Sequence, residues 1–229
     1  MTHVTGIACG NGHLSQGIWK GIAPHTNIIS LKILDRNGQG HSIHAVKALR
    51  GIMDNARQYN IRVVNLSVGT NDRKVNLPLK EAVEQLWQRG IVVVAAAGNP
   101  DSRKGYPPPP AISSNIISVG AWEDRRYFQE ASHPARKEPS LPDLWAPGDH
   151  IVSVLSPDYN FSLPSRSREN IVSSHYIRMS GASMATPLVS GAAALLLEKY
   201  PRARPGEVKE KLLHLSSDGL LKEEMLLNL

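Results

Sequence analysis

The stretch Ser180–Pro187, with the sequence SGASMATP, decides how the rest of this 229-residue chain is interpreted. It leads into Met184–Tyr200, a run of small and apolar residues that predicts a buried helix. A serine at the start of such a helix is held in a fixed position, and the partial positive charge of the helix N-terminus favours a developing anion there. The spacing is not that of the G-x-S-x-G elbow of α/β-hydrolases, because alanine occupies the last position. Ser183 is therefore either a nucleophile or a serine that caps the helix.

Upstream of this helix, strand-like and helix-like segments alternate, which is typical of an α/β fold with a parallel sheet. Strands are predicted at Asn27–Leu34, Arg62–Val68, Ile91–Ala97, Ile116–Ala121 and Ile151–Leu155. Further helices are predicted after a cap at Ser42, over Leu79–Trp87 with Gly90 as the stop, over Glu207–Leu215 and over Leu220–Leu229. A turn is predicted at Asn37–Gly40, a loop at Tyr127–Pro142 and an exposed segment at Arg166–Ser174. No boundary divides the chain, so we expect a single domain over residues 1–229.

Two of the predicted strands end in small and polar residues. Ala95–Asn99 places small residues and an amide donor at the carboxyl end of a strand, where ligands bind in parallel sheets. Asn65–Gly69 ends the preceding strand in the same way, so it is expected to line the same crevice. Asn99 is either an amide donor in a site or an ordinary turn asparagine.

The composition is that of a globular domain and argues against a membrane-spanning or nucleic-acid-binding protein. Apolar residues make up 41% of the chain and charged residues 20%, as in ordinary globular domains, and no run approaches the roughly 18 apolar residues of a membrane span. The net charge is +6, but the basic residues are scattered without an aromatic series beside them, which favours a solvated surface over nucleic-acid binding. Cys9 is the one cysteine, and this favours a reducing compartment such as the cytoplasm. Met1–Gly6 does not have the pattern of a signal peptide. We therefore expect neither a nucleic acid nor a membrane as partner.

Taken together, these segments resemble the subtilisin-like serine protease family (peptidase S8). Besides Ser180–Pro187, the matching stretches occur in the family's order. They are Thr2–Ile7, Lys20–Pro24, Leu31–Leu34, Val64–Ser67, Ala95–Asn99, Ser118–Ala121 and Pro142–Gly148. The resemblance implies an α/β fold of three layers with a mostly parallel central sheet that lacks its first strands, one of which would lie between Asn27–Leu34 and the next strand.

The resemblance also implies a serine endopeptidase that hydrolyses peptide bonds of a polypeptide substrate through an acyl-enzyme on Ser183, without a cofactor. Asn99 would stabilise the oxyanion together with the amide of Ser183. The implied substrate-binding residues are Gly38, Gly40, Ser67, Val68, Gly69, Ala96, Ala97 and Gly98. No metal site is predicted, and the loop Gly10–Gly17 in particular contains no carboxylate for calcium.

The chain departs from the family's pattern at its start. His3 matches the second histidine of the family's His-Gly-Thr-His motif, not the catalytic first one, so we expect a packed structural residue. The catalytic aspartate and histidine have no counterpart, and the catalytic domain is therefore expected to be incomplete at its N-terminus and inactive alone. Ala182 replaces the usual threonine before the nucleophile. Two alternatives stay open: a pseudoprotease or regulatory domain of the same fold, and an esterase of another fold with His214 as base.

Overall fold

The computed structural model describes residues 1–35, 37–69, 76–99, 109–125, 142–159 and 168–226. Its centre is a sheet with the strand order β1 (Val63–Leu66), β2 (Val92–Ala96), β3 (Ile117–Ala121) and β4 (Leu144–Ala146). All neighbouring pairs in this sheet are parallel. The residues of β2 and β3 are buried throughout, which explains why their sequences are continuous apolar runs and do not alternate. The predicted strands at Arg62–Val68, Ile91–Ala97 and Ile116–Ala121 are thus confirmed.

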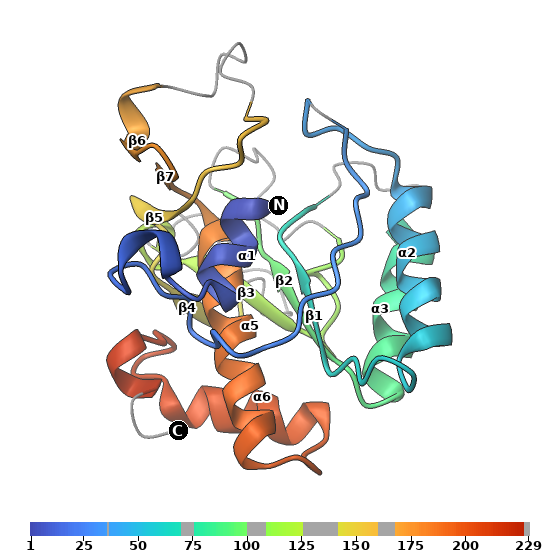
Figure 1. The fold of residues 1–229 in the computed structure, drawn as a ribbon. Coiled ribbons are helices and arrows are strands. Elements are labelled where there is room, and N and C mark those ends of the chain that lie inside the picture. The colour runs from blue at the N-terminus through green and yellow to red at the C-terminus, as the bar shows by residue number, and fades with distance from the viewer. Residues whose placement is uncertain (36, 70–75, 100–108, 126–141, 160–167, 227–229) are drawn as a thin grey trace.

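Helices cover both faces of this sheet, as Figure 1 shows. One face carries α2 (Ser42–Asn55) and α3 (Asn76–Gln88), and the other carries α1 (Thr2–Cys9), α5 (Ala182–Lys199) and α6 (Pro205–Leu215). Side chains alternate along β2, so Val93 packs in the core with α2 and α3, whereas Val92 and Val94 pack in the core with α5 and α6. The α/β fold of three layers is therefore confirmed.

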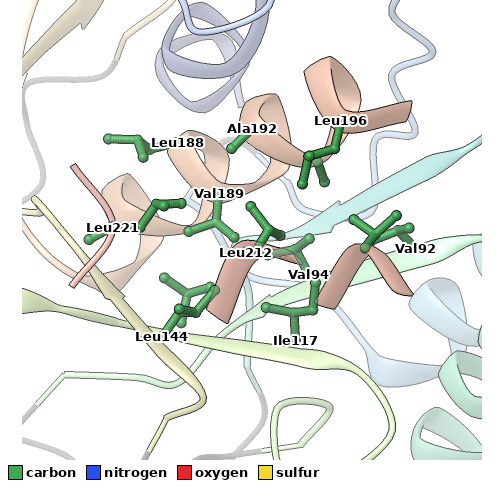
Figure 2. Packing of buried hydrophobic residues seen from close by; sticks show 14 of the residues in the cluster. Val92, Val94, Ile117, Leu144, Leu188, Val189, Ala192, Leu196, Leu212 and Leu221 are labelled. Carbon is green, nitrogen blue, oxygen red and sulfur yellow. The ribbon is translucent and has the colours of Figure 1, made fainter. Parts of the chain in front are cut away.

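Figure 2 shows the core beneath α5. Val189 and Ala192 of α5 and Leu212 of α6 meet Val94 and Ile117 of the sheet, and all of these side chains are fully buried. Burial of one such valine, leucine or isoleucine side chain contributes about 1.5–3 kcal/mol to stability. This packing fixes α5, and with it the N-terminus of α5, relative to the ends of the strands.

A second sheet leads into α5. It has the order β5 (Ile151–Val154), β7 (Tyr176–Met179) and β6 (Ile171–Ser173), with antiparallel pairing. Of these strands only β5 was predicted, because β6 and β7 are short and partly polar. Short 3₁₀ turns complete the described elements. They are η1 (His13–Ser15), η2 (Trp122–Asp124), η3 (Arg168–Asn170) and η4 (Glu223–Leu226).

Several boundary predictions need correction. Ser42 is the first helical residue of α2 and His41 is its N-cap, so the predicted serine cap is wrong. A 3₁₀ turn at Glu223–Leu226 replaces the helix predicted for Leu220–Leu229, whose last residues lie outside the described ranges, as does nearly all of the loop Tyr127–Pro142. Gly90 does end α3, because its positive φ of 87° lets Ile91 bond back to the carbonyl of Leu86.

The predicted strand Asn27–Leu34 is wrong in this structure. A strand exists only where a neighbour supplies hydrogen bonds, and these residues make none with any other described residue. Ile28 and Ile29 are each 50% exposed. Among the described residues, β1 pairs with β2 alone, so its other side is an edge of the sheet. Exposed apolar side chains and a strand edge without a described neighbour both favour self-association.

We predict that the double substitution Ile28→Lys and Ile29→Lys reduces self-association without unfolding the protein. Both side chains are half exposed, so the free energy of unfolding should change by no more than about 1 kcal/mol. Light scattering and thermal unfolding measure the two effects. Val93→Lys is the control, because a charge at this fully buried position should abolish the cooperative transition. Unchanged scattering of the double variant would show that association arises elsewhere.

Candidate active site

Ser183 lies in the first turn of α5, half-buried, where the helix meets the carboxyl end of β1. The N-cap of α5 is Gly181, which has no side chain, and the Ser183 side chain does not cap the helix. The hydroxyl of Ser183 instead donates a hydrogen bond to the carbonyl oxygen of Ser67, at 3.1 Å. The alternative of a helix-capping serine is therefore wrong.

The backbone N–H of Ser183 points out of the helix end without an acceptor among the described residues. Its neighbours are both engaged: the N–H of Ala182 donates to Oδ1 of Asn99 at 2.9 Å, and the N–H of Met184 donates to the carbonyl of Gly181 at 2.9 Å. The bond to Ala182 also ties the exposed Asn99 to the start of the helix, although the two residues come from distant parts of the chain. A free N–H and a fixed amide group side by side are suited to bind an anionic oxygen.

Pro187 explains why Ser67 and Ser183 form a reciprocal pair. Pro187 lies inside α5 and has no N–H, so the carbonyl of Ser183, four residues earlier, lacks its usual helical partner. The hydroxyl of Ser67 fills this place and donates to that carbonyl at 2.9 Å. The end of β1 and the first turn of α5 are thus joined by hydrogen bonds in both directions.

Gly181 permits the close approach of Asn99. Its φ of 126° lies in a region that favours glycine, and a Cβ atom there would lie 2.9 Å from Oδ1 of Asn99. The N–H of Gly181 donates to the carbonyl of Gly148 at 2.7 Å, so the turn after β4 also holds this segment.

The structure brings most of the expected substrate-binding residues to the same edge of the sheet. Ser67, Val68 and Gly69 directly follow β1, whereas Ala96, Ala97 and Gly98 lie at the end of β2 and lead into Asn99. Ala96 and Ala97 are buried, whereas Val68 and Gly98 are half-buried and Gly69 is exposed.

Gly38 and Gly40 lie apart from this group, in the exposed turn before α2. Asp35 accepts hydrogen bonds from the backbone of Asn37 and Gln39, which confirms the predicted turn. The described hydrogen bonds do not join this turn to Ser183 or Asn99.

His3 is a packed structural residue, as expected. It is 6% exposed, and its Nε2 lies 3.1 Å from the carbonyl oxygens of both Ile151 and Ile177, so Nε2 must carry the proton. Nδ1 is buried and has no hydrogen-bond partner among the residues that the structure describes. Burial lowers the pKa of His3 below its ordinary value of 6.5, because a charged imidazole would place an unpaired N–H in the interior.

His214 is equally unsuited to be a base for Ser183. It is exposed on α6, and its Nδ1 lies 2.7 Å from the carbonyl oxygen of Glu210. The alternative of an esterase with His214 as its base therefore has no geometric support.

The sequence did not reveal an exposed cluster of Asp149, His150 and Ser180 just before α5. The carboxylate of Asp149 accepts from Ser180 at 2.6 Å and lies 2.7 Å from Nδ1 of His150, and these bonds lower the pKa of Asp149. The side chains of Ser180 and His150 both bind the Asp149 carboxylate. They do not bind each other, so His150 does not activate the Ser180 hydroxyl. The hydrogen bonds of this cluster therefore hold the turn after β4 against the segment before Ser183.

In the part of the chain that the structure describes, no helix combines the length and the apolar character that crossing a membrane requires.

Comparisons with known proteins agree with this geometry. A family model described as the Subtilase family matches residues 2–228. The serine protease AprX of Bacillus subtilis is 36% identical over 234 residues, which cover 92% of this chain and 51% of that protein. The thermophilic serine proteinase of Bacillus sp. strain AK1 is 37% identical over 195 residues, covering 85% of this chain and 41% of that protein. The chain thus spans about half the length of these relatives or less.

Solved structures show the same fold. Sphericase superposes with a TM-score of 0.73 at 24% identity, covering 93% of this chain and 68% of that one. A cold-adapted subtilisin-like serine proteinase superposes with a TM-score of 0.66 at 24% identity, covering 94% of this chain and 67% of that one.

We predict that Gly181→Ala destabilises the protein and displaces Asn99. The backbone strain at this φ costs about 1–3 kcal/mol, and the added methyl group collides with the Asn99 amide. Urea unfolding measures the loss. Gly51→Ala is the matched control, because nothing lies within 4 Å of a Cβ at this helical position, and stability should rise by about 0.5–1 kcal/mol. Equal stability of the two variants would contradict the strain at Gly181.

We predict that the stability of the protein decreases as the pH falls below about 6.5 and that His3 causes part of this loss. The pKa of His3 is lower in the folded state, so below its ordinary value the unfolded state binds more protons and is favoured. His3→Gln should remove that part of the dependence, as measured by urea unfolding between about pH 5 and pH 8. The exposed His13→Gln variant should retain the wild-type profile. An unchanged profile in His3→Gln would assign the dependence to other groups.

Proposed function

Because the chain belongs to the subtilase family, we propose that its function is serine-type hydrolysis of peptide bonds with Ser183 as the nucleophile. The observation that carries this proposal is the N–H of Ser183, which has no acceptor among the described residues, beside the anchored amide of Asn99. The relatives are serine proteases by name, which supports the same reaction class.

In this reaction the Ser183 oxygen attacks the carbonyl carbon of a peptide bond, and the carbonyl oxygen becomes negatively charged. The Ser183 N–H, at the positive end of α5, and the side-chain N–H of Asn99 stabilise this charge. The bond from Ala182 to Oδ1 fixes which side of the Asn99 amide can donate. The acyl-enzyme is then hydrolysed by water.

Two groups of residues receive the polypeptide substrate in this proposal. Residues 67–69 and 96–98 line the pocket for the side chain before the scissile bond, where small residues leave room for a large apolar group. Gly38 and Gly40 pair with the extended substrate backbone, as strand addition allows.

We further propose that the chain alone does not turn over substrate. Attack by Ser183 requires a base that accepts its proton, but this proton is donated to the Ser67 carbonyl, and no described histidine or carboxylate bonds the hydroxyl. The described residues therefore supply neither this base nor a carboxylate that orients it. The same bond favours a second candidate function, a pseudoprotease that binds polypeptides without cleaving them.

We predict that residues 1–229 alone hydrolyse neither casein nor peptide anilides, because no described residue is placed to act as a base for Ser183. In any form of the protein that supplies a base, a fluorophosphonate should label Ser183. Asn99→Ala should then lower kcat about 10²–10³-fold with little change in KM, the magnitude known from subtilisin. Peptide-anilide kinetics and mass spectrometry of the labelled peptide provide the measurements.

The exposed Asn115→Ala variant is the control and should keep full activity. Labelling of another serine, or full activity of Asn99→Ala, would overturn the assignment. Polypeptide binding without labelling or turnover in that form would establish the pseudoprotease. Turnover near about 1 s⁻¹ by residues 1–229 that Ser183→Ala abolishes would refute the proposed inactivity.

A further inference from the structure

A row of polar side chains lies between β1 and α5, where the surrounding contacts are apolar. Val64 and Leu66 of β1 pack into the core with α2 and α3, so Asn65 lies on the opposite face of the strand, toward α5. Ser190 of α5 lies opposite and is only 5% exposed. A hydroxyl and an amide in an otherwise apolar interface require an explanation, because apolar side chains of similar size would fill the same space without needing partners.

These side chains form a continuous chain of hydrogen bonds that ends at Ser183. Ser190 donates to Oδ1 of Asn65 at 2.9 Å, and Nδ2 of Asn65 donates to the hydroxyl of Ser67 at 3.0 Å. Ser67 then donates to the carbonyl of Ser183, and the Ser183 hydroxyl donates back to the carbonyl of Ser67. Each hydroxyl has one proton, and this sequence of donors uses each proton once.

The direction of these bonds makes the Ser67 hydroxyl dependent on Asn65. Because Nδ2 of Asn65 occupies an acceptor position of the Ser67 oxygen, the Ser67 proton is directed toward the Ser183 carbonyl. Ser190 in turn holds Oδ1 of Asn65 and so determines which end of the amide faces Ser67. Ser190 has one other acceptor within reach, the carbonyl of Thr186 at 3.1 Å, and a switch to it would release Asn65.

We infer that Asn65 and Ser190 are positioning residues for Ser183. Through Ser67 they hold the first turn of α5 against the end of β1, so that the Ser183 hydroxyl occupies one rotamer beside Asn99. The role of Ser183 as nucleophile rests on the proposed function, whereas the control of its rotamer does not. A displaced nucleophile reacts more slowly even where the substrate still binds, so the effect should fall on kcat and not on KM.

The first test reads the rotamer directly in crystal structures of residues 1–229. Ser190→Ala removes the first donor, and Asn65→Asp keeps the acceptor for Ser190 but removes the donor to Ser67. Both variants should show Ser183 distributed over more than one χ1 rotamer, whereas the wild type shows one. Thr186→Val is the matched control: Thr186 is fully buried on the same helix and donates to Ala182, outside the chain of bonds, so Ser183 should keep one rotamer. A single unchanged rotamer in both test variants would overturn the inference.

The second test uses the fluorophosphonate reaction of any form of the protein that supplies the base. Ser190→Ala and Asn65→Asp should lower the labelling rate and kcat by about 10- to 100-fold with KM nearly unchanged, and Ser190→Thr should restore both. Thr186→Val should react like the wild type. Wild-type rates in both test variants would again overturn the inference. Absence of labelling in the wild type itself would contradict the proposed function, while the rotamers would still decide the positioning role.

Discussion

The packing of α5 against the parallel sheet is the constraint on which the rest of this structure depends. Fully buried side chains such as Val189 and Ala192 press the helix onto the strands, and α1 and α6 pack against the same helix. Alanine and glycine along α5 keep this distance short, because they carry little side-chain bulk. The N-terminus of the helix is thereby held at the carboxyl ends of β1 and β2 with little freedom to move.

Because α5 is held in place, residues that are ordinary by themselves come together in one site. Asn99 ends a strand and Ser183 begins a helix, and neither position is unusual by itself. Because the helix is fixed, the Asn99 amide accepts from the N–H of Ala182, and the N–H of Ser183 has no acceptor in the described part of the chain. Pro187 has no N–H, so the carbonyl of Ser183 lacks its helical partner and accepts a hydrogen bond from the Ser67 hydroxyl instead. This bond is the second contact that fixes the start of α5. The site is thus built largely from backbone groups whose helical partners are absent.

The sequence predicted those parts of the protein that depend on local pattern. Continuous apolar runs identified β2 and β3, and small residues identified α5, because burial dictates these compositions. Asn27–Leu34 was predicted wrongly, since its pattern suits a strand but pairing requires a neighbour that the described chain does not provide. The bond between Ser190 and Asn65 was not predictable, because it joins two ordinary polar residues whose proximity arises only from the packing of α5 on β1.

The bonds between β1 and α5 also determine when the site can form during folding. Ser67 and Ser183 are 116 positions apart in the chain, and Asn65 and Ser190 are 125 apart. Contacts of such high sequence separation form only after a long loop has been closed, and chains rich in them fold slowly. The helices, whose hydrogen bonds are local, can therefore form early, while the geometry around Ser183 is completed only when the two halves of the chain have docked.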